Sequence, residues 1–371
     1  MTFAFAEFWV SMTLQCTLLL SLVAWLSRRE TNSVIRDHLW SSCYLLILVL
    51  WTIGFLFPHL RLLPDPDLLS LNKPVAGVEV LERILQLIGI VWVAGVALLS
   101  IGLVISLLQT SQIVRKSSPW NSGIEDCEVC LREFGVETRT TPLALVPFCW
   151  QFHRPIIVIP QCMLDYPESE LRAILRHELG HLVSRHPFQL FLQRLAEILF
   201  WYLPYMWKCS EMAAMQRELV ADAWAVRNKE DAGALLQGLL RLSEQPMGKT
   251  PRMPSGLSFA GHGSLLQHRV DSLLRLVSAR PAKSSRAGRS LILLCIAAIG
   301  LGIIWLPVNP YASHRSLVSP WPKVSASALK GMGISVRDFE IDNHRLHEHP
   351  HSTNSTPKSL PSNGLNQRTA F

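Results

Sequence analysis

Residues 170–187 read ELRAILRHELGHLVSRHP, and this stretch predicts a single amphipathic helix. Glu170 at its start suits the positive end of a helix, and Pro187 at its end stops one. His177 and His181 are four residues apart and share one face, so both imidazoles can reach a single metal ion. Glu178 lies between them, where it can hold an attacking water rather than ligate the metal.

A catalytic zinc ion takes three protein ligands and keeps one position open, so the two histidines need a partner. His186 has the wrong spacing for the third histidine of an HxxGxxH pattern. Further along, residues 216–222 read QRELVAD, which places Glu218 and Asp222 one helical turn apart on the same face. We predict that Glu218 is the third ligand and that Asp222 accepts a hydrogen bond from a ligating imidazole and orients it.

These residue types predict one catalytic zinc ion and the hydrolysis of peptide bonds. Zinc lowers the pKa of a water molecule toward 7 and polarises a carbonyl group. Glu178 would take the proton of the water and pass it to the leaving amine. The alternative is a surface helix that happens to carry two histidines, since an HExxH pattern arises by chance in roughly two chains per hundred of this length. The downstream acidic pair favours the metal site.

The composition indicates a membrane protein. Of the 371 residues, 49% are hydrophobic and only 17% are charged, with a mean hydropathy of +0.25. A soluble domain carries about a quarter charged residues. The net charge of +7 suits a protein that collects Lys and Arg on its cytoplasmic loops. No basic stretch is interleaved with aromatic residues, so direct binding of nucleic acid is not expected.

Three apolar segments approach the roughly 20 residues that a crossing of the lipid bilayer requires, and a fourth is shorter. They cover residues 8–26, 39–57, 84–108 and 291–306. Basic residues gather between the first two segments, after the third and before the fourth, which makes that side cytoplasmic. The N-terminus and the C-terminal tail then lie outside. The first segment lacks the features of a cleaved signal peptide.

A fifth apolar stretch, Phe188–Trp207, contains Arg194, Glu197 and Pro204, which are costly or disruptive in a bilayer-spanning helix. If this stretch crossed the membrane, Glu218 would lie on the opposite side from the two histidines. One metal ion could not then bind all three side chains. We therefore expect the stretch to turn back to the cytoplasmic side or to lie flat on the membrane.

The expected fold class is a mainly α membrane protein with about four transmembrane helices. A cytoplasmic α+β zinc peptidase domain, gluzincin-like because a glutamate completes its metal site, lies between the third and fourth helices. Further helices are expected near residues 124–134, 206–228 and 232–243, and strands near 136–146 and 155–160. The expected divisions are three transmembrane helices, the peptidase domain, the fourth helix and a disordered tail: residues 1–109, 110–289, 290–307 and 308–371.

The stretch Pro155–Pro160 is a short apolar, β-branched run between two prolines, which is typical of a strand. An exposed strand edge beside the zinc ion can pair with an extended peptide. We therefore predict a substrate-binding strand made of Ile156, Ile157, Val158 and Ile159.

Two other groups support weaker hypotheses. Cys127 and Cys130 form a lone CxxC, which indicates either two thiols on one turn of an amphipathic helix or a redox or accessory metal role. Four histidines between residues 344 and 351 indicate either a solvated polar tail or loose metal binding.

Together these motifs resemble the BlaR/MecR-type membrane metallopeptidases, the regulatory family that includes the bacterial β-lactam-sensing receptors. The resemblance covers roughly Trp9–Trp305 and depends on the order of the motifs between the third and fourth apolar segments. The matching stretches are Arg154–Pro160, Glu170–Pro187, Leu199–Pro204, Arg217–Asp222 and Arg269–Leu274.

The resemblance implies a multi-pass protein of the bacterial inner membrane whose cytoplasmic zinc protease domain cuts itself or a regulator, such as a transcriptional repressor, after an outside signal. The β-lactam receptors continue into a penicillin-binding sensor, and the residues after Pro307 are too few for one. SxxK matches at residues 327–330 and 355–358 lack the accompanying SDN and KTG motifs, so β-lactam sensing is not expected. His186 also stands where the family often has an acidic residue. Signal, substrate and oligomeric state stay open.

Three other classes share part of this pattern. The HtpX and CAAX-prenyl-protease families carry both metal-site motifs, with a different arrangement of crossings. Site-two proteases place HExxH inside a crossing, whereas Arg172, Arg176 and Arg185 surround it here. A non-catalytic membrane transducer with a relict site is the third alternative, and the intact set of metal-site residues argues against it.

Overall fold

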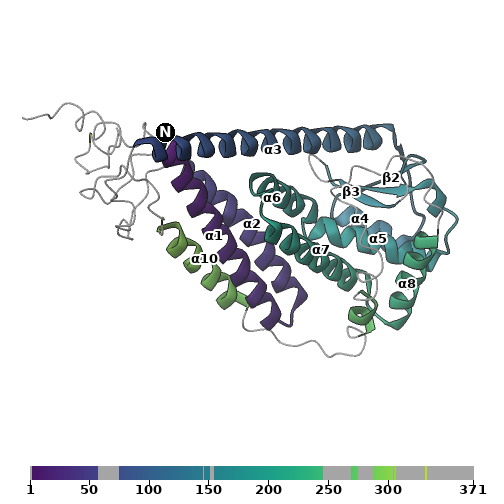
Figure 1. Cartoon of the computed structure of the whole chain (residues 1–371). Helices are drawn as coiled ribbons and strands as arrows, with labels where there is room; N and C mark the ends of the chain where they lie inside the picture. Colours follow the sequence, from purple (N-terminus) through teal and green to yellow (C-terminus); the bar gives the residue numbers. More distant parts are fainter. Residues whose placement is uncertain are drawn as a thin grey trace, which may run out of the picture.

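The computed structural model describes residues 2–56, 75–144, 146–150, 154–244, 269–274 and 287–303, together with residues 305 and 331. Within these ranges the protein is mainly helical, with one small sheet far from the N-terminus (Figure 1). The four histidines at residues 344–351, both SxxK matches and the basic residues at 275–286 lie outside the described residues.

Three helices are long and apolar enough to cross a membrane: α1 (Thr2–Arg29), α2 (Ser33–Leu56) and α3 (Val75–Lys116). A further apolar helix, α10 (Ala287–Ile303), is shorter and packs against α1 and α2. Ser290 near the start of α10 donates a hydrogen bond to Glu30 in the α1–α2 loop, and the ring of Trp305 beyond its end stacks on Phe8 of α1. The helix therefore runs along most of the length of α1 (Figure 1).

The long helix α3 packs against α1 and α6 and runs from beside the N-terminus to the sheet (Figure 1). Exposed apolar side chains cover it, including Leu87, Ile90, Val93 and Leu98. Such a surface suits contact with lipid, because the backbone polar groups of a helix are satisfied internally.

The stretch predicted either to turn back or to lie flat turns back. It forms α6 (His186–Leu199) and the start of α7 (Pro204–Ala225), a hairpin packed against α2. At its turn, the Tyr202 hydroxyl lies 2.6 Å from the Thr13 hydroxyl of α1, and Trp92 of α3 donates a 3.0 Å hydrogen bond to the Leu199 carbonyl. The chain thus enters the helix bundle along α6 and returns along α7.

Polar side chains inside this hairpin form hydrogen bonds and an ion pair with one another, which lowers the free-energy cost of burying them. Arg194 forms an ion pair with Glu197. Gln193 donates a 2.8 Å hydrogen bond to Glu197 and accepts a 2.7 Å hydrogen bond from Arg217 of α7. This network joins the two arms of the hairpin.

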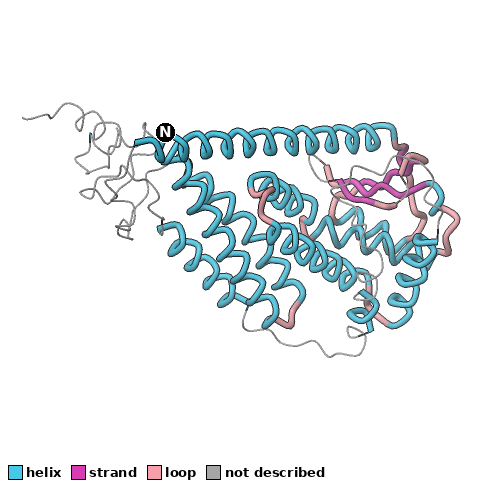
Figure 2. The backbone as a smooth tube through the Cα atoms, in the orientation of Figure 1, coloured by secondary structure: helices cyan, strands magenta, loops and turns pink. Residues whose placement is uncertain are grey.

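Beyond α3 the chain builds a four-stranded sheet covered by helices (Figure 2). The strand order is β1 (Ser118–Pro119), β2 (Glu137–Thr141), β4 (Ile156–Pro160) and β3 (Phe148–Trp150). β2 and β4 are parallel, and the outer pairs are antiparallel. The helices of this region are α4 (Glu125–Glu133), the 3₁₀ turn η2 (Gln161–Met163), α5 (Glu168–Val183) and α8 (Lys229–Glu244).

The predicted strand near residues 155–160 forms as β4, but its expected exposed edge is wrong. β2 pairs with one side of β4 and β3 pairs with the other. Ile156, Ile157, Val158 and Ile159 are all buried. Because both edges are occupied, a peptide cannot add to β4. The described sheet ends in β1 on one side and in β3 on the other, and β3 lies outside the strands predicted from the sequence.

Candidate metal centre

The candidate site lies where α5 crosses α7. Gly180 makes this crossing close: a Cβ atom added there would lie 2.7 Å from Cβ of Trp224 and 3.2 Å from Cα of Ala221. A residue without a side chain therefore lets the two helices approach. As a result, the histidines on α5 meet the acidic residues on α7.

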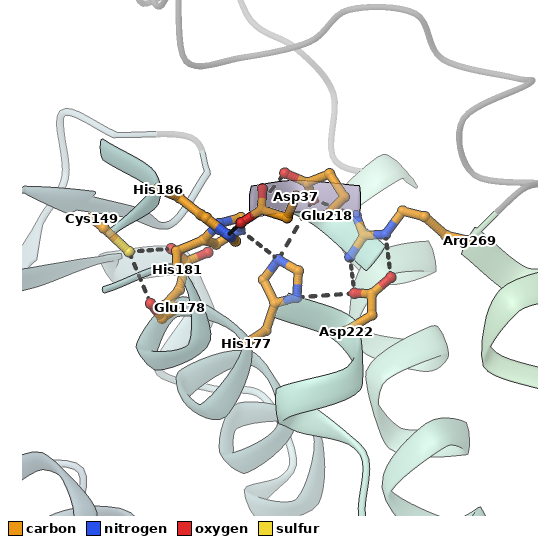
Figure 3. A network of polar contacts seen from close by, with 9 residues as sticks. All are labelled: Asp37, Cys149, His177, Glu178, His181, His186, Glu218, Asp222 and Arg269. Atoms are coloured by element: carbon orange, nitrogen blue, oxygen red, sulfur yellow. Dashed lines mark hydrogen bonds and ion pairs between the residues drawn. The ribbon is translucent and has the colours of Figure 1, made fainter. Parts of the chain in front are cut away.

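His177 and His181 of α5 and Glu218 of α7 converge on one point (Figure 3). The two Nε2 atoms are 3.2 Å apart; Nε2 of His177 lies 3.6 Å from Oε2 of Glu218, and Nε2 of His181 lies 3.6 Å from Oε1. A tetrahedral ion with bonds of about 2.0–2.1 Å would hold its ligand atoms about 3.3–3.5 Å apart. The three side chains therefore approach the geometry that one such ion requires, and a shift of the Glu218 carboxylate would complete it.

Asp222 supports this group from behind His177. It is fully buried, and its Oδ1 lies 2.9 Å from Nδ1 of His177. Arg269 donates two hydrogen bonds to the Asp222 carboxylate, of 2.9 Å and 2.6 Å, and its Nη1 lies 3.3 Å from Glu218. The structure thus places Asp222 where the sequence analysis expected it. Arg269 was named there only as part of a stretch that matches the family, because nothing in its local sequence marks it as a partner of a residue 47 positions away.

The charges in this group favour a bound cation. Burial disfavours a charged His177, but the carboxylates of Asp222 and Glu218 outweigh it and raise the pKa of His177 to about 9. Burial also disfavours ionised carboxylates, yet contacts with His177 and Arg269 hold the pKa of Glu218 and of Asp222 below their usual values. Burial lowers the pKa of His181 well below its ordinary value. A divalent ion that displaced the His177 proton would meet an ionised carboxylate and a neutral imidazole.

Glu178 contacts the sheet. Its Oε2 and its backbone carbonyl oxygen both lie 3.0 Å from Sγ of Cys149, in the middle of β3. Burial raises the pKa of Glu178, which suits a carboxylate that must accept and return a proton. The sequence analysis missed Cys149, since a single cysteine in a three-residue strand forms no pattern.

A cavity of about 310 Å³ borders these residues. Glu178 and the three clustered side chains line one part of it. Val146, Pro147, Phe148 and Cys149 form the wall toward the sheet, and three leucines of α8 form an apolar wall: Leu235, Leu239 and Leu242. A peptide in the cavity would have both the cluster and an apolar surface beside it.

The second ring nitrogen of His181 contacts a third histidine, which lies outside the cluster. Its Nδ1 lies 2.7 Å from Nδ1 of His186, the first residue of α6. Nε2 of His186 lies 3.5 Å from Asp37 of α2 (Figure 3). His186 is therefore behind His181 and is not a member of the cluster.

The CxxC pair lies on α4, as the helical interpretation expected. Cys127 is buried, Cys130 is partly buried, and both are free thiols. Neither belongs to the metal-binding group.

The fold and the site define a class: membrane proteins in which a helix-borne His-His-Glu group can hold a metal ion. The chain belongs to the BlaR1 peptidase M56 family, whose model matches residues 67–253. Among curated proteins, "Regulatory protein BlaR1" of Bacillus licheniformis is 20% identical over 204 residues, which are 53% of this chain and 34% of that protein. The chain thus spans about a third of the length of this relative. The resemblance seen in the sequence is confirmed.

Proposed function

We propose that this chain is a membrane-embedded zinc metalloendopeptidase with a regulatory role, which cleaves itself or a cytoplasmic regulator such as a transcriptional repressor. The observation that carries the proposal is the spacing of His177, His181 and Glu218, which fits one tetrahedral ion beside Glu178 and a cavity. Membership of a peptidase family and similarity to a regulatory protein support it.

The two Nε2 atoms and a carboxylate oxygen of Glu218 would hold the ion, which leaves one position open. When bound, zinc supplies Lewis-acid chemistry that polarises the scissile carbonyl and acidifies a water molecule. Glu178 accepts the proton of the attacking water at its carboxylate and delivers it to the leaving amine. Cys149 holds that carboxylate in place through its thiol.

We propose β3, in place of β4, as the strand that receives the substrate. β3 is one of the two end strands of the described sheet, and its residues Phe148 and Cys149 line the cavity. A peptide that paired with the outer side of β3 would lie extended past Glu178, because Glu178 contacts Cys149.

We further propose that α10 makes a fourth crossing. The peptidase region, residues 110–289, would then lie in the cytoplasm of a bacterial cell and both termini would lie outside. Basic residues end both α1 and α3, and α10 begins beside the α1–α2 loop. The 17 residues of α10 span about 26 Å, slightly less than the roughly 30 Å of a bilayer core, and local thinning accommodates this mismatch.

The test compares the wild type with Glu178→Gln and with Glu168→Gln, an exposed glutamate on the same helix. Each full-length protein is purified in detergent, its zinc is measured by elemental mass spectrometry, and cleavage of itself and of labelled casein is followed on gels. We expect one zinc per chain in all three proteins and a loss of cleavage of about 10²-fold or more in Glu178→Gln alone.

Each other outcome contradicts a part of the proposal. A wild type without zinc would remove the metal centre. Equal cleavage by Glu178→Gln would remove the catalytic role of Glu178. Zinc without cleavage in the wild type would favour a non-catalytic transducer.

A further inference from the structure

Asp37 is a carboxylate on a membrane-spanning helix that points toward the metal centre (Figure 3). It lies in the second turn of α2 and is only 2% exposed. Its Oδ2 accepts a 3.1 Å hydrogen bond from Gln189 and lies 3.5 Å from Nε2 of His186. A buried carboxylate in such a helix is costly unless it is paired, and both of these partners come from the start of α6.

The proton positions along this chain of contacts have one consistent order. If His181 binds an ion through Nε2, its proton is on Nδ1 and is donated to Nδ1 of His186. His186 then carries its own proton on Nε2, the nitrogen that faces Asp37. A shift of about half an ångström would bring these two groups to ordinary hydrogen-bond distance.

His177, the other histidine of the cluster, contacts a carboxylate directly, without a second histidine between them. Nδ1 of His177 lies directly beside the carboxylate of Asp222. Each imidazole is therefore backed by a buried carboxylate, from α7 for His177 and from α2 for His181. His186 bridges the longer gap to α2.

We propose that His186 and Asp37 are a positioning pair that orients His181, so that membrane helix α2 is a structural part of the metal centre. The proposal rests on the proposed function only in taking His181 as a metal ligand. Partners of this kind fix the tautomer and the ring orientation of a ligand, and their removal lowers metal affinity about 10- to 100-fold. A displacement of α2 relative to α6 would loosen the site in the same way.

The test is a double-mutant cycle on the full-length protein in detergent, with Asp37→Asn, His186→Gln and the double variant. Zinc affinity is measured by competition with a chromophoric chelator, and the site geometry is followed in the absorption spectrum of the cobalt-loaded protein. Tyr44→Phe is the matched control, because it removes a buried contact between α2 and Ser210 of α7 that is not part of the pair.

We expect each single variant to weaken zinc binding about 10- to 100-fold and to change the cobalt spectrum. The double variant should be no weaker than the worse single one, because both changes break one chain of contacts. Tyr44→Phe should bind zinc like the wild type. In the Asp37→Asn background, His186→Asp should restore affinity, since an aspartate there accepts directly from Nδ1 of His181.

Unchanged affinity in both single variants, or losses that simply add in the double variant, would overturn the pairing. A loss equal to that of Tyr44→Phe would show a general packing effect and overturn it as well. The wild type distinguishes this result from a failure of the proposed function. A wild type that binds zinc without cleaving refutes the peptidase and leaves the positioning pair to be decided by the cycle, and a wild type without zinc refutes the ligand role of His181.

Discussion

Arg269 explains how the fully buried Asp222 and the partly buried Glu218 can lie one helical turn apart. Glu218 and Asp222 are both ionised in the described site, and their repulsion would be strong at low dielectric. The guanidinium group of Arg269 contacts both, with a two-point hydrogen bond to Asp222. Its planar shape suits this contact in a way that a lysine could not reproduce.

Replacing Arg269 with Gln should therefore destabilise even the zinc-free protein. The change leaves the fully buried Asp222 carboxylate without its cation, which costs about 3–5 kcal/mol. The control is Arg172→Gln, which removes an ion pair with Glu168 on the surface of α5 and should cost less than about 1 kcal/mol. Unfolding of the two variants in detergent checks this, and equal losses would mean that Arg269 is not the specific counter-charge.

Among the elements, the crossing of α5 and α7 determines whether the metal centre can form. Each helix contributes ligands, and neither contributes a complete set. Their close approach depends on Gly180, whose added Cβ would collide with Trp224 and Ala221.

Gly180→Ala should accordingly separate the helices, cost about 1–3 kcal/mol of stability through overpacking, and weaken zinc binding. Gly233→Ala in α8 is the matched control, because no atom lies within 4 Å of the added methyl group there. That control should be neutral or stabilising by up to about 1 kcal/mol, since alanine favours a helix. Thermal unfolding and a zinc titration of both variants measure the effect. A Gly180→Ala protein with normal zinc affinity would show that the helices can adjust.

Local periodicity is what made much of this site predictable from sequence. His177 and His181, and likewise Glu218 and Asp222, are related by one helical turn, and a helix places such residues on one face wherever it lies in the fold. Because one ion cannot be bound from both sides of a membrane, the same residues predicted that Phe188–Trp207 does not cross it.

The contacts that could not be predicted from the sequence depend on long-range packing. Arg269 and Asp37 reach the site only through the tertiary fold, and Cys149 meets Glu178 because β3 is an end strand. The error at Ile156–Ile159 has a different origin. An unbroken apolar run is typical of a strand buried on both faces, which usually lies inside a sheet rather than at its edge.

For the whole molecule, the arrangement of helices places the metal centre at one end of the membrane bundle. The contact between His186 and Asp37 brings α6 to the start of α2, and the α1–α2 loop is at that same end. The hairpin of α6 and α7 extends from there into the bundle as far as Thr13. The candidate site and the α1–α2 loop should therefore lie on the same side of the membrane.

Labelling with a membrane-impermeant maleimide tests this topology in whole cells. The native thiol of Cys162 is exposed and reports on the peptidase region once Cys130 and Cys295 are changed to Ser. In a protein that also carries Cys162→Ser, Thr31→Cys reports on the α1–α2 loop and Asp67→Cys on the segment between α2 and α3. We expect Asp67→Cys to react in intact cells, and Cys162 and Thr31→Cys to react only after permeabilisation, because basic residues keep their side cytoplasmic. Labelling of Cys162 and Thr31→Cys from opposite sides would contradict the contact between α6 and α2. Labelling of both in intact cells would show that the whole protein has the opposite orientation, which would place any cytoplasmic substrate out of reach.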